Sequence, residues 1–213
     1  MIAVISGATG LVGSFLLPQL LSHKAISKVI SVGRRPTGIQ HVKLEEILAP
    51  EIHNLSGFEQ KLIGDFYFCC LGTTIKVAGS QANFYRIDHD AVVEFGRIAK
   101  LHSAKSLLVV TASGANAKSM IYYSRVKGET ERDLRALQVN RLVIFHPSLL
   151  LGRKGGGRAA EETFTKIAEK LQPWLPDFLG KRAMTSAEHL AEQMCTSALR
   201  EGNGVEVIEA AQI

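Results

Sequence analysis

The residues Ile2-Ala-Val-Ile-Ser-Gly-Ala-Thr-Gly-Leu-Val-Gly13 decide the fold of this chain. Residues 2–6 are a short apolar run, which predicts a buried β-strand. Three glycines follow at G-x-x-G-x-x-G spacing, and an apolar helical pattern then continues to about Ser22. Pro18 lies inside that pattern, where a proline removes a helical hydrogen bond, so we expect a kink or a nearby helix end.

Further apolar runs predict strands along the rest of the chain. They lie at residues 28–32, 66–71, 107–111, 142–146 and 205–208. Helical patterns fill most of the gaps, most clearly at 80–102, where apolar residues recur at steps of three and four. This alternation predicts an α/β fold, a Rossmann-like doubly wound parallel sheet with helices on both faces. Residues 38–64 are too weakly patterned to assign.

The length of 213 residues predicts a single domain. We expect residues 1–152 to form the cofactor-binding core and residues 153–213 a small, helical, substrate-side extension. The glycine-rich stretch 153–158 predicts a flexible connector, with helical patterns following at 159–171 and 186–200. The apolar tail residues offer either a pocket wall or ordinary core packing; they are Phe164, Trp174, Leu175, Phe178 and Met184.

Composition excludes several classes of protein. Hydrophobic residues make up 46% and charged residues 21%, which excludes disorder. The longest apolar run, residues 66–71, is too short to span a membrane, and no signal peptide is predicted. Only three cysteines occur, two of them adjacent, which indicates a reducing compartment, so we expect a cytoplasmic protein. The histidines and cysteines lack metal-ligand spacing, so no metal is expected, and Asp88 and its neighbours indicate a cap or a solvated surface.

The glycine turn predicts a phosphate-binding site. Gly7 suits a tight turn, Gly10 lets backbone N–H groups approach a pyrophosphate, and Gly13 lets the helix pack close to the strand. The pyrophosphate then meets the positive end of the helix. The alternative is a plain strand-to-helix turn without a ligand. The residues predicted to bind the cofactor here are Gly7, Ala8, Thr9, Gly10, Leu11, Val12 and Gly13.

The end of the second predicted strand indicates which dinucleotide is bound. NAD-binding turns usually find an acidic residue about 20 positions further on, for the ribose 2′-hydroxyl. This chain has Arg34 and Arg35 there, and guanidinium groups attract a 2′-phosphate. We therefore expect NADP(H), with a solvated loop pair as the alternative. Leu71, Gly72 and Thr73, after the third predicted strand, are expected beside the adenosine ribose.

Tyr123 and Lys127 form a candidate acid–base pair. They are four residues apart, so on a helix they share one face. A neighbouring ammonium lowers the pKa of a phenol, and Tyr123 then exchanges a proton with a carbonyl or alcohol oxygen. Lys127 also reaches the nicotinamide ribose in this arrangement. Such pairs also occur by chance on solvated helices.

The glycine turn, the Leu71-Gly72-Thr73 segment and the Tyr123–Lys127 spacing together resemble the short-chain dehydrogenase/reductase superfamily. The stretches at 123–129 and 147–153 resemble its atypical, NADP-binding branch that includes the Tat-interacting oxidoreductase-like proteins. The resemblance implies catalytic roles for Tyr123 and Lys127. It also implies a carbonyl-polarising hydroxyl after the fourth strand, from Ser113, which we favour, or Thr111. By the same resemblance, Thr111 and Pro147 lie beside the cofactor, and a nucleotide-sugar substrate is disfavoured.

These features together predict an NADP(H)-dependent oxidoreductase that reduces a small carbonyl compound. The alternative is a weakly catalytic or non-catalytic protein that binds NADPH and signals redox state. The net charge of +5 is interspersed along the chain, which favours a local anionic ligand over nucleic acid. We expect no nucleic-acid or membrane partner, and either a monomer or a homodimer.

Overall fold

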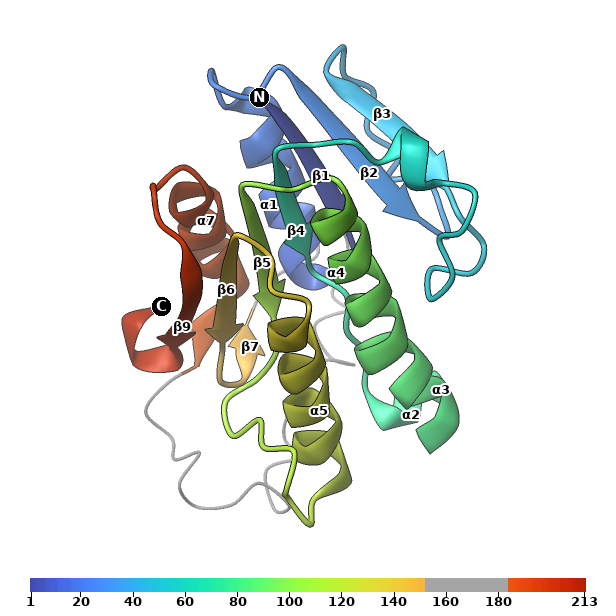
Figure 1. Ribbon diagram of the computed structural model, residues 1–213, viewed down its shortest axis with the longest axis vertical. Helices are drawn as coiled ribbons and strands as arrows, with labels where there is room; N and C mark the ends of the chain where they lie inside the picture. Colours follow the sequence, from blue (N-terminus) through green and yellow to red (C-terminus); the bar gives the residue numbers. More distant parts are fainter. Residues whose placement is uncertain (152–183) are drawn as a thin grey trace.

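A seven-stranded parallel sheet forms the centre of the computed structural model, which describes residues 1–151 and 184–213 (Figure 1). The strand order is β3-β2-β1-β4-β5-β6-β9. The strands are β1 (Ile2–Ser6), β2 (Lys28–Gly33), β3 (Leu44–Leu48), β4 (Phe66–Cys69), β5 (Ser106–Val110), β6 (Arg141–His146) and β9 (Gly204–Glu209). Two short strands, β7 (Leu150–Leu151) and β8 (Thr185–Ser186), pair separately. The expected Rossmann-like sheet is confirmed.

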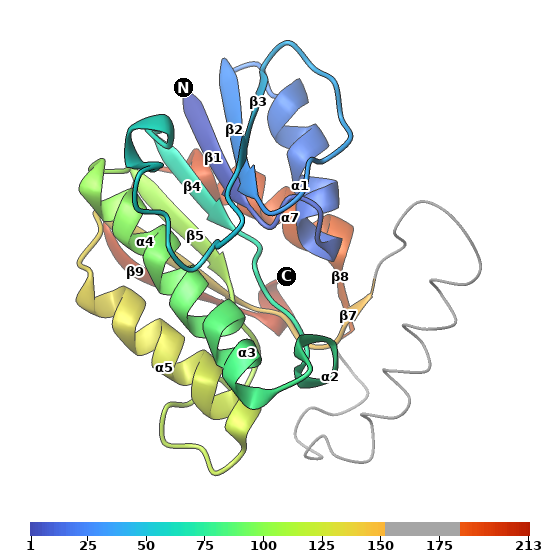
Figure 2. The ribbon, with the colours of Figure 1, turned by 90° about the vertical axis from the view of Figure 1, so that its right-hand side faces the viewer.

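The helices cover both faces of the sheet, as Figures 1 and 2 show. One face carries α1 (Leu11–Ser22) and α7 (Ala187–Ala198), whose apolar residues share a core with alternate strand residues such as Ile5. The other face carries α4 (Ala91–Leu101) and α5 (Tyr122–Ala136). Because strand residues alternate between the faces, the fully buried Val4 packs on this second side.

The crevice of this sheet lies beside β1. The chain runs from β1 through β2 to β3 and then returns to β4 on the opposite side of β1. In open α/β sheets, ligands bind at such a switch point, outside the carboxyl ends of the strands. The turns after β1, β2 and β4 therefore meet at one place, and these turns carry the predicted cofactor residues.

Two predicted helices differ in detail from expectation. Pro18 lies on the exposed side of α1, and the helix continues past it to Ser22, so the helix end follows the proline within about one turn. The 80–102 pattern contains α3 (Gln81–Tyr85), the π-helical turn η2 (Arg86–Asp90) and α4. The apolar face of this segment is buried within the same chain: Phe95 and Ile98 pack in the core on the sheet, and Phe84 packs against α5.

The structure adds elements that the sequence pattern left open. Strand β3 lies within the unassigned stretch, and short helical segments occupy Glu59–Lys61 (η1) and Ile75–Ala78 (α2). The last predicted strand is present as β9, which pairs in parallel with β6. Helix α7 packs on α1, so α7 and β9 belong to the Rossmann body although they were expected in the substrate-side extension. The 3₁₀ turn η5 (Ala210–Gln212) follows β9.

Some predictions fall outside the described residues. These are the connector at 153–158, the helical pattern at 159–171, and the expected wall residues Phe164, Trp174, Leu175 and Phe178. Met184 is described and is 62% exposed. In residues 1–151 and 184–213, no helix has the length and apolar character needed to span a membrane.

Candidate functional site

The glycine turn joins β1 to α1 in a conformation that requires glycine. Gly7 has a φ of +83°, and a Cβ atom there would lie 2.5 Å from the carbonyl of Cys70 at the end of β4. A Cβ atom on Gly13 would lie 2.2 Å from Gly7 O. The Gly10 N–H donates to Gly7 O at 2.9 Å and closes the turn. Because Gly7 and Gly13 have no side chain, β1, β4 and α1 can approach one another closely.

The amino end of α1 is suited to a phosphate. Its N-cap is Gly10, and no side chain of the described residues caps it; its first turn contains no acidic residue. Free N–H groups and the helix dipole give this end a partial positive charge. Leu11 and Val12 begin the helix, with the Val12 side chain buried in the core and its backbone at the helix end. The structure thus fits the predicted pyrophosphate position.

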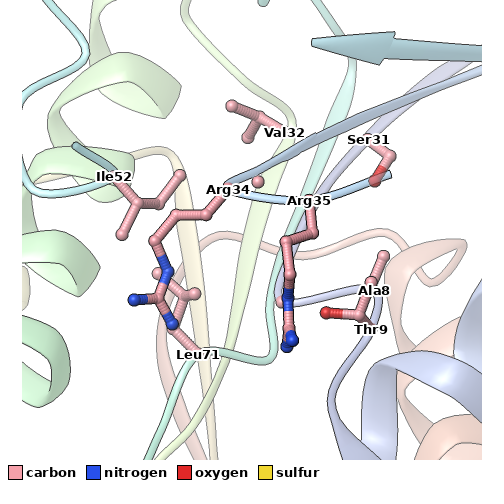
Figure 3. A pocket seen from close by; sticks show the side chains of 10 residues that line it. Ala8, Thr9, Ser31, Val32, Arg34, Arg35, Ile52 and Leu71 are labelled. Carbon is pink, nitrogen blue, oxygen red and sulfur yellow. The ribbon is translucent and has the colours of Figure 1, made fainter. Parts of the chain in front are cut away.

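A pocket of about 70 Å³ opens beside this turn, between the ends of β1, β2 and β4 (Figure 3). Figure 3 shows the two guanidinium groups extending from the end of β2 in one direction, Arg34 toward Leu71 and Arg35 toward Thr9. Neither arginine forms an ion pair with any residue that the structure describes. The pocket is lined by Gly7, Ala8, Thr9, Ser31, Val32, Gly33, Arg34, Arg35, Ile52 and Leu71.

Four of these lining residues were not predicted as site residues: Ser31, Val32, Gly33 and Ile52. Ile52 lies in the stretch that the pattern left unassigned, and no local signal identifies it. The other three lie within β2, where they have the pattern of ordinary strand residues. All four lie at the pocket because the carboxyl ends of neighbouring strands converge there.

The chain after β4 connects this pocket to the predicted acid–base pair. Leu71 lines the pocket, whereas Gly72 lies against Asp88 and Lys127. A Cβ atom on Gly72 would be 3.6 Å from Asp88 Oδ1 and 3.7 Å from Lys127 Nζ. The Thr73 N–H donates to Asp88 Oδ2 at 2.9 Å. The predicted adenosine-side and catalytic residues therefore form one continuous site.

Lys127 forms a buried ion pair with Asp88. Their Nζ and Oδ1 atoms are 2.7 Å apart, and the two side chains are 5% and 0% exposed. The expectation that Asp88 caps a helix or faces solvent was wrong. The sequence held a signal for this, because Asp88 follows Phe84 by four residues and precedes Ala91 by three, which places it on the buried stripe. A carboxylate on such a stripe needs a cationic partner.

The π-helical turn η2 presents Asp88 to Lys127. Such turns replace the regular hydrogen-bond pattern and are frequent at functional sites. Here the single hydroxyl proton of Thr130, on α5, is shared between two backbone carbonyls, Asp88 O at 2.9 Å and Val126 O at 2.8 Å. Thr130 therefore fixes η2 to the same helix that carries Lys127.

Tyr123 lies at the start of α5, with its ring against Phe84 at a centroid distance of 5.7 Å. Although the residue is 37% exposed, burial raises its pKa above 10.0; Lys127 lowers the pKa and Asp88 raises it. The net direction of the pKa shift is upward, contrary to the expected lowering, because the effect of burial outweighs the Lys127 charge and Asp88 adds to the rise. Tyr122 is held differently, since its hydroxyl donates to Gln81 O at 2.9 Å.

The two candidate hydroxyls after β5 are distinguished by their partners. Thr111 is buried and donates to Glu131 Oε1 at 2.7 Å. Ser113 is half-buried and donates to His146 O at 3.0 Å, while its N–H donates to Pro147 O at 3.0 Å. The Thr111 hydroxyl is held by a charged, buried acceptor. To bind a substrate oxygen, the Ser113 hydroxyl would have to break only one hydrogen bond, to a neutral backbone carbonyl. Pro147 itself is buried beside Ser113.

No group of three or more histidine, cysteine or carboxylate side chains suited to a metal ion occurs within residues 1–151 and 184–213. Burial raises the pKa of the Cys70 thiol well above 9.0, so this cysteine stays in its unreactive thiol form.

Curated relatives of this chain are found in fungi. It is 32% identical to "Protein fmp52, mitochondrial" of Emericella nidulans over 161 residues, which is 73% of this chain and 69% of that protein. It is 36% identical to "Protein FMP52, mitochondrial" of Candida glabrata over 171 residues, covering 78% and 71% of the two chains. No protein-family model matches the chain.

Two expectations are corrected by these relatives. The expected cytoplasmic location was wrong, because the relatives are described as mitochondrial proteins. The resemblance to Tat-interacting oxidoreductase-like proteins is replaced by a match to proteins of another name. The broader Rossmann-like assignment is unaffected by either correction.

Solved structures share the fold at low sequence identity. The enzyme MoeE5, in complex with UDP-glucose and NAD, has a TM-score of 0.74 at 16% identity, covering 98% of this chain and 75% of that one. The Bordetella bronchiseptica enzyme WbmH, in complex with NAD+, has a TM-score of 0.72 at 16% identity, covering 96% and 74%. These likenesses establish the Rossmann-like architecture.

Proposed function

The chain belongs to the Fmp52 family, and on that premise we propose that it is an NADP(H)-dependent oxidoreductase that reduces a small carbonyl compound. The observation that carries this proposal is the continuity of the site. The dinucleotide turn and its two arginines lie next to the strand end against which Lys127 and Asp88 pack. Solved proteins with this fold bind NAD, which supports a nicotinamide cofactor.

The residues around the glycine turn would hold the cofactor. The N–H groups at the start of α1 bind the pyrophosphate, and the pocket after β2 takes the adenosine end. Arg34 and Arg35 bind the 2′-phosphate, since both guanidinium groups face the pocket without a described acidic partner. When bound, the cofactor supplies the hydride.

Tyr123 supplies the proton. Its raised pKa keeps the phenol protonated at neutral pH, which suits donation to a carbonyl oxygen as negative charge develops there. Lys127 stays charged, since burial lowers its pKa but Asp88 and Tyr123 raise it further, to a net value above 10.5. The ammonium beside Tyr123 stabilises the phenolate that remains after proton transfer. Ser113 orients the carbonyl oxygen.

NADPH oxidation over a panel of aldehydes and ketones tests this proposal. Tyr123→Phe is expected to lower kcat by about 100-fold or more, the usual contribution of a positioned proton donor. Tyr122→Phe is the matched control, because its hydroxyl is bound to Gln81 O, and it is expected to keep wild-type turnover. Equal rates for Tyr123→Phe and wild type would contradict the catalytic assignment.

A second candidate function is supported by the hydroxyl contacts. Both Thr111 and Ser113 donate their hydroxyl protons to acceptors within the protein. These features favour a protein that binds NADPH and signals redox state with little turnover. Micromolar NADPH affinity without oxidation of any panel compound would support the sensor, whereas turnover that requires Tyr123 would exclude it.

We also propose a mitochondrial location, as the names of the relatives state for them. Cell fractionation of the tagged native protein tests this directly.

We propose that the chain binds a small carbonyl substrate and that it binds neither nucleic acid nor a membrane. The chain is either a monomer or a homodimer, and sedimentation would distinguish the two.

A further inference from the structure

A partly buried cluster of side chains next to Ser113 joins three strands and α5. The ring of His146, at the end of β6, lies between two carboxylates: Nε2 is 2.7 Å from Glu131 Oε1 and Nδ1 is 3.1 Å from Glu209 Oε1. Glu131 projects from α5 and Glu209 ends β9. The Thr111 hydroxyl, after β5, donates to the same Oε1 atom of Glu131 at 2.7 Å. The side chains of His146 and Glu131 are 12% and 9% exposed.

The protonation state of His146 decides how many of these contacts hold. An imidazolium donates from both ring nitrogens, so it binds Glu131 and Glu209 together. A neutral ring has one donor and one lone pair, and the lone pair repels whichever carboxylate faces it. Deprotonation therefore opens one of the two contacts and leaves two carboxylates near an uncharged ring.

The same residue contacts the candidate site through its backbone. His146 O accepts the Ser113 hydroxyl, and the next residue, Pro147, accepts the Ser113 N–H. A ring fixed on two sides therefore fixes the segment that positions Ser113. We propose that His146 is a positioning residue whose protonated form sets Ser113 for substrate, so that carbonyl reduction is switched off as His146 loses its proton. This inference rests on the proposed reductase function.

The surrounding charges favour the protonated ring. Arg135 of α5 is the other charged group at Glu131, with Nη2 3.7 Å from Oε2, and β5 contributes only the neutral Thr111. Burial lowers the pKa of His146, but Glu131 and then Glu209 raise it, and the net pKa lies above 6.5. His146 therefore loses its proton, and reduction stops, at a pH above the ordinary histidine pKa.

The test is the pH profile of kcat for NADPH-dependent reduction in four proteins. In wild type, kcat is expected to fall by about tenfold per pH unit above the His146 pKa. His146→Arg keeps a positive charge between the two glutamates at all pH values, so this alkaline fall should disappear. Glu209→Gln removes one carboxylate from an exposed position, and the fall should move to lower pH.

His102→Gln is the matched control. His102 follows α4, is half-buried and binds Glu59 O at 2.8 Å, so it takes no part in the His146 contacts and its profile should equal that of wild type. A role in folding alone would lower the melting temperature without moving the fall in kcat. Melting curves at each pH therefore accompany the assay, and Glu209→Gln remains informative if His146→Arg does not fold.

The outcomes separate the two proposals. If both His146→Arg and Glu209→Gln turn over substrate and kcat falls at the same alkaline pH as in wild type, the role of His146 is overturned. The reductase function would still stand. NADPH binding without turnover at any pH would overturn both. A fall that disappears in His146→Arg and shifts in Glu209→Gln would establish the positioning role.

Discussion

Lys127 Nζ lies 2.7 Å from Asp88 Oδ1, and this ion pair is almost completely removed from water. Its partners come from α5 and from the π-helical turn η2, two segments far apart in the sequence. A buried pair is costly to desolvate but strongly unfavourable to break, because one charge is then left without a partner. The ion pair therefore contributes to the stability of the site, and it keeps Lys127 positively charged beside Tyr123.

Replacing one member of this pair is expected to destabilise the protein. Asp88→Ala should lower the free energy of unfolding by about 3–5 kcal/mol, because the Lys127 ammonium is left buried and unpaired. The double variant Asp88→Leu with Lys127→Met should be more stable than Asp88→Ala, because it removes both charges. Urea unfolding measures both, and a double variant less stable than the single one would refute the ion-pair account.

The two arginines after β2 are expected to select NADPH over NADH. Arg34→Ala and Arg35→Ala should each weaken NADPH binding by roughly 10- to 100-fold, which corresponds to about 1.5–3 kcal/mol for a hydrogen bond to a charged group. NADH lacks the 2′-phosphate, so its affinity should change little. Calorimetry with both coenzymes measures this, with the exposed Lys118→Ala as control. An equal loss for NADH would show that the arginines do not bind the 2′-phosphate.

Gly13 is expected to tolerate no side chain. In Gly13→Ala the new Cβ would lie 2.2 Å from Gly7 O, so α1 must move away from β1. We expect a loss of about 1–3 kcal/mol in stability, as for other overpacked sites, together with weaker NADPH binding. Gly33→Ala is the control for stability, because its new methyl group would lie 3.8 Å from the nearest neighbouring atom and its φ is not positive. Equal melting temperatures for wild type and Gly13→Ala would contradict this close approach.

His146 is expected to make stability depend on pH. Its pKa in the fold lies above 6.5, so the folded state holds the proton more tightly than the unfolded chain. The resulting stabilisation is fully present below about pH 6.5 and is lost as pH rises through the folded pKa. The stability difference between wild type and His146→Gln should therefore shrink with increasing pH. Chemical denaturation from pH 5.5 to 9 measures it, and a difference that grows with pH would have the wrong sign.

Sequence reasoning was most successful where the signal is local. The glycine spacing at residues 7–13 requires a particular turn, since only glycine allows such close backbone approach, and the strand runs were recognised by their apolar character. The stretch containing β3 was missed because its residues are only partly buried and carry two glutamates, Glu45 and Glu46, so it lacks a strong apolar pattern.

The sequence by itself determined the α/β fold, the glycine turn and the four-residue spacing of Tyr123 and Lys127, because these depend on neighbours along the chain. Tertiary structure alone decided that Asp88 faces Lys127, that Thr111 is committed to Glu131 and that His146 lies between Glu131 and Glu209. The register of β6 against β9 and the packing of α5 and η2 on the sheet bring these groups together. In these buried surroundings, each charged group depends on its ion-pair partner. The spacing of residues along the chain does not reveal which distant carboxylate lies beside a buried cation.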